Sequence, residues 1–397
     1  MKRVFLYNPE NDIALAHGSA NFTAPKNAVI LSRYCAPLMW WLGDEGDYVI
    51  VPRDMPGDYM DELARWERKL TETFGAGPRL ITSAEGIDDS VAAPWGWSRH
   101  AVRRFQDSCA DTSAAAIDEG RAERLRQLSH RRTAAEINRR LGEEVDFARY
   151  GLPVPVAATE VSDEEAVRRY FDQHGEFYIK LPWSSSGRGV RHVTADTFDS
   201  IAGQIGGMLK KQGSVMLEPA YDKTDDFAML FYAERGKVKL KGLSLFFTAH
   251  GEAYGGNLIA EDGEILGRLS AKIPKALLTE TGEALEKILG AILGKDYEGW
   301  MGVDMMLARS GGRYILVPCV ELNLRMTMGV IAHQTALRLL GAGYELRHCG
   351  YVMQTEPGNS AAGNTDGRRQ HVADMVPKND KFNIRLLRER AGWNRPL

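Results

Sequence analysis

Two short stretches in the last third of the chain decide its fold: GVDMML at residues 302–307 and VELNLRMTMG at residues 320–329. The first stretch and residues 314–317 (YILV) are apolar and rich in residues that favour strands. The segment between them, ARSGGR at residues 308–313, has the composition of a turn. The pattern therefore predicts a β-hairpin.

This hairpin brings two carboxylates together. The midpoint between Asp304 and Glu321 falls next to Gly312, so a regular hairpin sets the two side chains roughly opposite each other. Because side chains alternate along a strand, Glu321, Asn323 and Arg325 share a face if the strand runs that far. Two carboxylates and an amide oxygen suit Mg²⁺, which also takes phosphate oxygens, and an arginine can bind phosphate through two hydrogen bonds. The hairpin predicts a metal–nucleotide site, with a surface hairpin of scattered charge as the alternative.

Length and composition limit the classes of protein. A chain of 397 residues predicts two or three lobes, and 44% hydrophobic with 26% charged residues is typical of a soluble globular protein. A formal net charge of −3 provides no field for nucleic acid or an anionic membrane. Four widely spaced cysteines and the lack of a visible signal peptide or membrane span favour a cytoplasmic protein with reduced thiols.

The first 90 residues alternate strands with helices, which indicates a small α/β lobe with a parallel sheet. Short strands are expected at residues 4–7 and 48–51. Ligands of such lobes lie beyond the carboxyl ends of strands, although an ordinary turn explains polar residues there nearly as well. The candidate substrate contacts after the first strand are Asn8, Glu10, Asn11 and Asp12.

Three further segments link this lobe to the hairpin. The sequence PWGWS at residues 94–98 is expected to pack in a core, and residues 119–141 are expected to form one long helix. An antiparallel meander is predicted from residue 215 to residue 245, followed by a glycine-rich loop at residues 253–257. Residues 355–369 have the composition of a loop.

A second motif, FYIKLPWSSSGRGV, occupies residues 177–190. It predicts a strand that carries Lys180, a Ser/Gly loop, and another strand over residues 190–193. Hydroxyl donors and unhindered backbone N–H groups suit a flexible cover over phosphates. A Walker A loop is excluded because no Gly-Lys-Ser/Thr tripeptide occurs in the chain, and a Rossmann fingerprint needs three glycines turning into a helix.

In this order the pieces resemble the ATP-grasp superfamily over residues 125–343: a lysine on a strand, a Ser/Gly loop, a strand ending in Glu218-Pro219, an acidic residue at 226, and the Asp…Glu-x-Asn-x-Arg hairpin. The resemblance implies a fold of class α/β plus α+β, in which a small parallel-sheet lobe precedes a two-subdomain ATP-grasp module with antiparallel sheets. The expected domains are residues 1–120, the module at 121–350, and a C-terminal loop and tail at 351–397.

The resemblance also implies roles for individual residues. Lys180 would hold the α- and β-phosphates, and Arg325 would bind the transferred phosphoryl group or the acyl phosphate. Glu218 would line the adenine pocket and Asp226 would accept from the ribose hydroxyls. The residues of the loop that covers the phosphates would be Ser184, Ser185, Ser186, Gly187, Arg188 and Gly189. The ligands of one or two Mg²⁺ ions, which Mn²⁺ can replace, would be Asp304, Glu321 and Asn323.

The sequence departs from the family pattern at one point. Many members carry a further phosphate-binding lysine upstream, where this chain has Ser129-His130-Arg131-Arg132, so Arg131 or Arg132 would have to stand in. The basic residue that contacts the γ-phosphate stays open among four candidates. These are Lys239, Lys241, Arg268 and Lys272.

By this resemblance the protein is an ATP- and Mg²⁺-dependent ligase that activates a carboxylate as an acyl phosphate for attack by an amine or similar nucleophile. Its partners would be a small-molecule or peptide carboxylate, an amine-type acceptor and a second copy in a homodimer, with no nucleic acid or membrane. Two alternatives stay open: an ATP-binding regulatory module or pseudoenzyme, and a phosphotransferase that acts on a hydroxyl. Cys319, two residues from Glu321, is expected to be a packed thiol.

Overall fold

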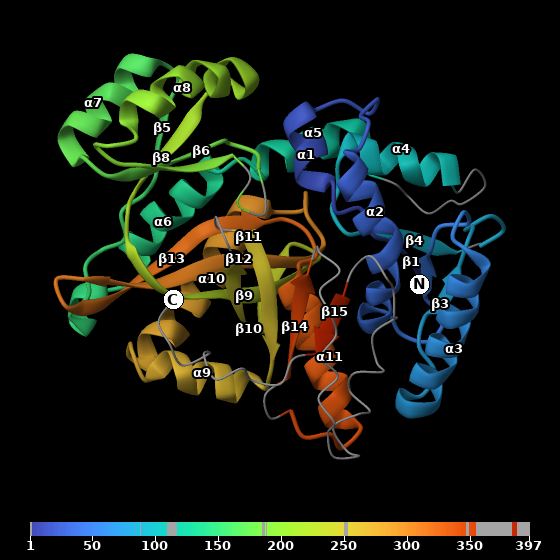
Figure 1. Cartoon of the computed structure of the whole chain (residues 1–397). Coiled ribbons are helices and arrows are strands. Elements are labelled where there is room, and N and C mark those ends of the chain that lie inside the picture. Colours follow the sequence, from blue (N-terminus) through green and yellow to red (C-terminus); the bar gives the residue numbers. More distant parts are fainter. Residues whose placement is uncertain are drawn as a thin grey trace.

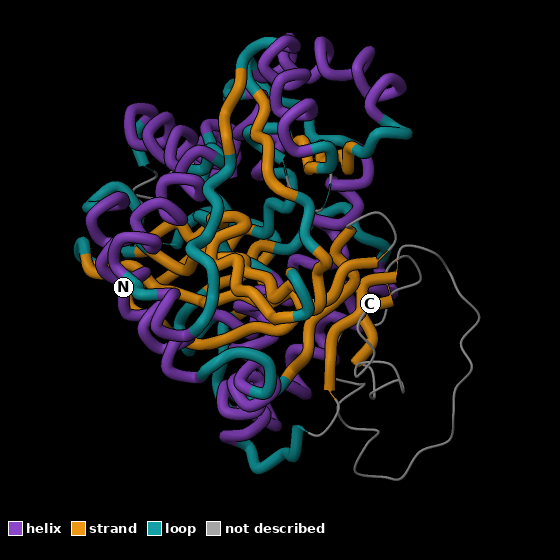
Figure 2. The backbone as a smooth tube through the Cα atoms, turned by 90° about the vertical axis from the view of Figure 1, so that its left-hand side faces the viewer, coloured by secondary structure: helices purple, strands orange, loops and turns teal. Residues whose placement is uncertain are grey.

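The computed structural model describes residues 2–87, 89–108, 117–184, 187, 189–249, 253–346, 349–354 and 383–386. Its strands form three sheets. Figure 1 shows an N-terminal lobe in blue and cyan on one side of a large central sheet, with a small green sheet above that sheet. Figure 2 shows the small sheet and its helices at one end of the large sheet.

The N-terminal lobe is built on a parallel sheet of order β3-β2-β1-β4. Its buried centre is a 3₁₀ helix, η1 (Ala36–Leu42), in which every residue is buried, including Trp40 and Trp41. The apolar positions of α3 (Gly57–Phe74) recur every three to four residues and pack against that centre. The other elements are β1 (Lys2–Leu6), α1 (Asn11–His17), α2 (Lys26–Cys35), β2 (Tyr48–Ile50), β3 (Arg79–Ile81), β4 (Ser90–Pro94) and α4 (Arg99–Ser108).

The small antiparallel sheet has the order β5-β8-β6-β7. Its strands are β5 (Thr159–Val161), β6 (Phe177–Lys180), β7 (Val190–Val193) and β8 (Val215–Pro219). Two helices, α7 (Glu164–His174) and α8 (Phe198–Gln212), share an apolar core with it around Phe177 and Ile179. The predicted strand that carries Lys180 and the strand that ends at Pro219 are confirmed.

The large sheet has the order β13-β12-β9-β10-β11-β14-β15, and its paired strands are antiparallel. One face packs against α10 (Lys275–Leu293) and α6 (Arg132–Glu144). The other packs against α11 (Met328–Gly341) and, through it, the N-terminal lobe. The remaining elements are α5 (Glu119–Leu128), η2 (Phe147–Tyr150), β9 (Asp222–Glu234), β10 (Lys237–Ala249), β11 (Ala253–Ile259), α9 (Asp262–Ser270), β12 (Gly299–Ser310), β13 (Arg313–Asn323), β14 (Cys349–Gln354) and β15 (Asn383–Leu386).

These three sheets confirm the predicted fold class, a lobe with a parallel sheet followed by a part built on two antiparallel sheets. The domain limits at residues 120 and 350 stay predictions. Strands β14 and β15 add to the large sheet at and beyond the second limit. The loop expected at residues 355–369 lies outside the described residues.

Three local predictions were wrong. The antiparallel meander expected from residue 215 to residue 245 is limited to β9 and β10, because β8 pairs with β5 and β6 in the small sheet. The helix expected over residues 119–141 is two helices, because the chain turns at Ser129–Arg131 between α5 and α6. The loop expected at residues 253–257 belongs to strand β11. Gly255 falls at a register shift between β10 and β11, where a Cβ would come within 2.6 Å of the Phe247 ring. Glycine here permits close packing within a sheet rather than a turn.

The central hairpin and the pairing of its two carboxylates are confirmed, although the ladder is not regular throughout. Asp304 pairs with Glu321, and Ser310 pairs with Arg313 across a two-residue turn. Both turn residues have positive φ, 56° at Gly311 and 78° at Gly312, as a type I′ turn requires. The turn sets the register from the Ser310–Arg313 pair to the Met306–Val317 pair, and a register shift between Asp304 and Met306 then brings Asp304 opposite Glu321.

We predict that Gly312→Val lowers the free energy of unfolding by about 1–2 kcal/mol, because a β-branched residue resists the left-handed conformation. Gly312→Asn is the matched control, since asparagine adopts this conformation more readily. Urea unfolding of the three proteins measures the difference. Equal stability of the valine and asparagine variants would contradict the dependence of the hairpin on this turn.

Candidate active site

The pairing of β12 with β13 places Asp304, Glu321 and Asn323 together. Asp304 and Glu321 are opposite each other on adjacent strands, and the Asn323 amide donates to Asp304 Oδ2 at 2.9 Å. Burial and the neighbouring Glu321 carboxylate raise the pKa of Asp304 to about 7. The site therefore carries negative charge that the surrounding cations only partly offset.

This donor set fits a hard divalent cation. Within the described part of the chain no three His, Cys, Asp or Glu side chains form a metal-binding group. The set here is two carboxylates and one amide oxygen, and Mg²⁺ commonly completes such a set with waters and phosphate oxygens. A cation beside the pair would favour the ionised form of Asp304, whose pKa burial raises.

The predicted lysine and acidic residues lie around this pair. Lys180 Nζ is 2.5 Å from Glu218 Oε2, and both side chains are largely buried. Asp226 forms an ion pair with Lys223 at 2.9 Å. Its carboxylate is also close enough to Asp304 to contribute to the raised pKa of Asp304. The structure thus brings the acidic residue of β9 to the metal-ligand candidates.

The Ser/Gly loop joins β6 to β7. Of its predicted residues, Ser184, Gly187 and Gly189 are described, while Ser185, Ser186 and Arg188 lie outside the described residues. The Leu181 N–H donates to the Gly189 carbonyl at 2.9 Å, so the ends of the loop are held together.

Trp183 holds the beginning of this loop in place. Its backbone N–H and carbonyl both bond to the Gln212 side-chain amide, at 2.9 and 3.0 Å. Its indole N–H donates to the Arg126 carbonyl at 2.9 Å, and the Arg126 guanidinium lies 4.1 Å above the ring. The beginning of the loop is therefore held in place by contacts with Gln212 and Arg126.

The break between α5 and α6 distinguishes the two candidate arginines. Arg131 is 6% exposed, and its guanidinium is 3.2 Å from Glu321 Oε1. Arg132 turns away to pair with Glu160 at 3.0 Å, and 55% of its side chain is exposed. Arg131 is thus the arginine at the candidate site.

Three of the four candidate ligands of the γ-phosphate form ion pairs with acidic residues. Lys272 pairs with Asp225 at 2.5 Å, and Arg268 pairs with Glu264 at 2.8 Å. Lys239 pairs with Glu286 at 2.7 Å. Lys241 is exposed. These contacts do not single out one of the four as the γ-phosphate ligand.

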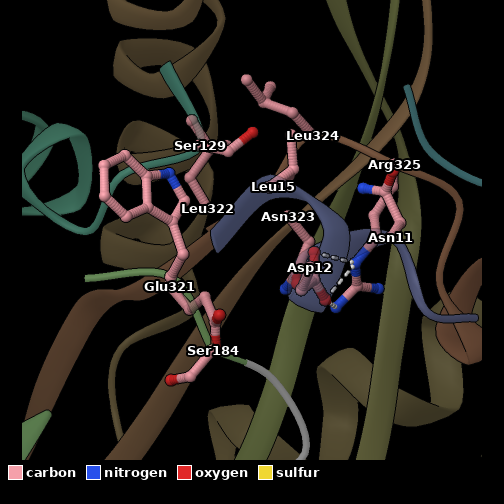
Figure 3. A pocket seen from close by; sticks show the side chains of 11 residues that line it. Asn11, Asp12, Leu15, Ser129, Ser184, Glu321, Leu322, Asn323, Leu324 and Arg325 are labelled. Carbon is pink, nitrogen blue, oxygen red and sulfur yellow. Dashed lines mark hydrogen bonds and ion pairs between the residues drawn. The ribbon is translucent and has the colours of Figure 1, made fainter. Parts of the chain in front are cut away.

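The N-terminal lobe reaches the same place through one ion pair. Arg325 lies just beyond β13 and donates from Nε to both carboxylate oxygens of Asp12, at 3.0 and 3.2 Å (Figure 3). The backbone of Arg325 forms a β-bridge with Gly96, and the Met326 N–H donates to the Trp95 carbonyl at 2.8 Å. The PWGWS turn was expected only to pack in a core. Its backbone also contacts the segment that follows β13 and carries Arg325.

Of the other N-terminal candidates, two have structural partners. Asn8 bonds to the backbone of Gly96, and Glu10 is buried and pairs with Arg104 at 2.7 Å. Asn11 and Asp12 line a hollow with Ser184, Glu321 and Arg325 (Figure 3).

Arg131 lines a second hollow. This hollow encloses about 310 Å³ including its open mouth, and Glu218, Pro219, Tyr221 and Cys319 are also among its lining residues. Cys319 is buried, as expected, and burial with the nearby carboxylates holds the pKa of its thiol well above the usual value.

The comparisons with known proteins are limited to the fold. No protein-family model matches the sequence, and no curated protein matches it. Among solved structures the chain is similar to N5-carboxyaminoimidazole synthetase from Staphylococcus aureus complexed with ADP, at 11% identity, with 97% of this chain and 92% of that chain covered and a TM-score of 0.46. It is also similar to biotin carboxylase from Campylobacter jejuni in an ATP complex, at 12% identity, with 91% and 77% covered and a TM-score of 0.47.

A third similar structure is D-cycloserine synthetase, at 13% identity, with 86% of this chain and 98% of that chain covered and a TM-score of 0.41. Sequence identities and TM-scores this low do not identify a substrate. The function of this chain therefore has to be inferred from the residues of the candidate site. No helix among the described residues is long and apolar enough to cross a membrane.

We predict that Asp304→Asn stabilises the protein above pH 7, raising its melting temperature by a few degrees. A folded-state pKa of about 7 exceeds the usual value near 3.9, so the native state binds the proton more tightly than the unfolded state. The contribution of Asp304 to stability therefore falls as pH rises from about 4 to about 7. The asparagine variant has no ionisable group at residue 304, so its stability does not fall with pH for this reason.

The measurement is the melting temperature of both proteins between pH 5 and pH 8.5 without divalent cations. Asp172→Asn, which removes an exposed carboxyl on α7, is the control for a general charge effect. A difference between wild type and Asp304→Asn that does not grow with pH would contradict the raised pKa.

Proposed function

We propose that this chain is an ATP- and Mg²⁺-dependent ligase of the ATP-grasp type, which activates a carboxylate for attack by an amine or similar nucleophile. The observation that carries the proposal is the Asp304, Glu321 and Asn323 set beside Arg325 and the Ser/Gly loop. A protein that only bound a nucleotide would have less need of two carboxylates at a metal.

The nucleotide would lie between the two antiparallel sheets. The hollow at Glu218, Pro219 and Tyr221 supports an adenine position there. Phosphates that extend from this hollow would meet Lys180 and Arg131, whose buried positive charges suit phosphate oxygens. Asp226 would receive the ribose hydroxyls. Asp304, Glu321 and Asn323 would hold one or two Mg²⁺ ions, which Mn²⁺ can replace.

The reaction would proceed in two transfers. A carboxylate oxygen of the substrate attacks the γ-phosphorus of ATP, the bond to the β–γ bridging oxygen breaks, and ADP leaves. The bound Mg²⁺ supplies charge neutralisation at the phosphate oxygens. Arg325 would bind the transferred group and stabilise the charge that develops on it.

In the second transfer the amine attacks the acyl carbon, inorganic phosphate leaves with the bonding electrons, and the amine loses a proton. The acyl phosphate is labile in water, so the site has to exclude solvent while it exists. The loop from Ser184 to Gly189 is anchored at Trp183 and suited to that task. No covalent enzyme intermediate is required.

The partners would be a small-molecule or peptide carboxylate and an amine-type acceptor. Asn11 and Asp12, which line the hollow at Arg325, are the N-terminal residues best placed to contact one of them. A cytoplasmic homodimer without nucleic acid or membrane partners remains part of the proposal.

We predict that the purified protein binds ATP at micromolar concentration in a Mg²⁺-dependent manner by calorimetry. Glu321→Ala should weaken this binding by at least about 100-fold, since even residues that only support metal ligands contribute up to that factor. Glu283→Ala, an exposed change on α10, should bind as the wild type does. Wild-type protein that binds no nucleotide, or Glu321→Ala that binds it normally, would contradict the proposal.

Product analysis then distinguishes the reaction. With pools of carboxylates and amines, a ligase releases ADP and inorganic phosphate in equal amounts. Phosphate retained on a hydroxyl product would instead identify a phosphotransferase. Binding without any turnover across the pools would favour the regulatory module.

A further inference from the structure

Arg131 lies at the boundary between the two hollows of the candidate site. It lines the hollow that also contains Glu218 and Cys319. Its ion-pair partner Glu321 and its hydrogen-bond partner Ser184 line the hollow that contains Asp12 and Arg325. The Arg131–Glu321 ion pair of 3.2 Å therefore joins the two hollows at one point.

The position of Arg131 is fixed by the chain break between α5 and α6. Its backbone N–H donates to the Pro182 carbonyl at 3.1 Å, and its Nε donates to the Leu181 carbonyl at 3.2 Å. Its Nη2 is 3.4 Å from the carbonyl and from the hydroxyl of Ser184. The guanidinium is thus attached to the start of the phosphate-covering loop, and the carboxylate it contacts is Glu321.

Glu321 therefore has two alternative cationic partners, the Arg131 guanidinium and the proposed metal ion. In the structure described here its partner is Arg131, whereas as a ligand it would face a divalent metal. A free metal ion that displaced Arg131 would leave a guanidinium that is 6% exposed without its carboxylate, which is costly for a buried charge. A nucleotide changes this balance, because its phosphate oxygens can replace Glu321 as the partner of Arg131.

We propose that Arg131 is a positioning residue that couples metal loading to nucleotide binding. Without nucleotide it occupies Glu321 and weakens metal binding. With nucleotide it moves to the phosphates, and Glu321 becomes available to the metal. This inference depends on the proposed function, since it assigns the order in which that site is filled.

The coupling has to be reciprocal. If a nucleotide strengthens metal binding by a given factor, the metal strengthens nucleotide binding by the same factor. The exchange at Arg131 also links both events to the loop, because the same guanidinium holds the Leu181 and Ser184 carbonyls. The site would then select the metal–nucleotide complex over either component alone.

The first test measures Mn²⁺ binding by electron paramagnetic resonance, with Mn²⁺ alone and with saturating ADP. Three proteins are compared: wild type, Arg131→Gln, and the control Arg132→Gln, which changes the neighbouring exposed arginine. We expect Arg131→Gln to bind Mn²⁺ alone at least about fivefold more tightly than wild type. The gain that ADP adds should shrink by a similar factor, and Arg132→Gln should match wild type.

A second variant covers the case in which Arg131→Gln disturbs the loop or the fold. Glu321→Gln keeps Arg131 and removes its charged partner. It should bind ADP in the presence of EDTA at least about fivefold more tightly than wild type, because the guanidinium no longer has a carboxylate to leave. A purely structural role for the ion pair would leave this metal-free affinity unchanged or lower it. Melting curves verify that each variant is folded.

The outcomes separate the two proposals. If wild type and Arg132→Gln bind Mn²⁺ with ADP, but neither Arg131→Gln nor Glu321→Gln shows its gain, the coupling is refuted and the proposed function stands. If wild type binds neither ADP nor Mn²⁺ with ADP, the proposed function fails and the coupling falls with it. Gains in both variants establish the exchange.

Discussion

The opposition of Asp304 and Glu321 across two strands is the constraint on which the rest of the site depends. Like charges directly opposite each other destabilise a sheet, yet the hairpin register imposes this pair. The molecule offsets it with the Asn323 amide on Asp304 and the Arg131 guanidinium on Glu321. Burial, and after it the neighbouring Glu321, raise the pKa of Asp304. Under the proposed function, a bound cation would offset both effects.

The same constraint explains why three parts of the chain converge here. Arg131 comes from the helix break before the small sheet, Arg325 follows β13, and Asp12 belongs to the N-terminal lobe. Arg325 is joined to the lobe by its ion pair with Asp12 and by the backbone bridge to Gly96. The N-terminal lobe thus contributes Asn11 and Asp12 to the wall of the candidate site.

Sequence reasoning succeeded where the signal is local. The apolar strands and the Gly311–Gly312 turn lie within about twenty residues. They predicted the hairpin and the facing of Asp304 and Glu321, but the register shift between Asp304 and Met306 that produces this facing has no signal in the sequence pattern. The Lys180 strand and its loop were predicted for the same reason. The contacts of Arg325 with Asp12, 313 residues apart, carry no periodic signal, and neither does the docking of Trp95 on Met326. The break at Ser129–Arg131 was missed because the apolar residues on either side of it were assigned to one helix face, although residues 129–133 contain no apolar side chain. At Gly255, composition alone could not separate a turn from close packing within a sheet.

The charges of the site share one further property. Lys180 contacts Glu218, Arg131 contacts Glu321, Arg325 contacts Asp12, and Lys223 contacts Asp226. Each cation suited to a phosphate or an acyl phosphate is thus held by an acid that itself has a proposed role or lines the site. Such pairing keeps partly buried charges compensated before any ligand arrives. A ligand that brings both phosphates and a metal can replace these contacts on both sides at once, whereas a simple anion or a bare cation replaces only half of each pair. Under the proposed function, selectivity for a metal–nucleotide would then follow from how the protein neutralises its own charges, independently of any single ligand contact.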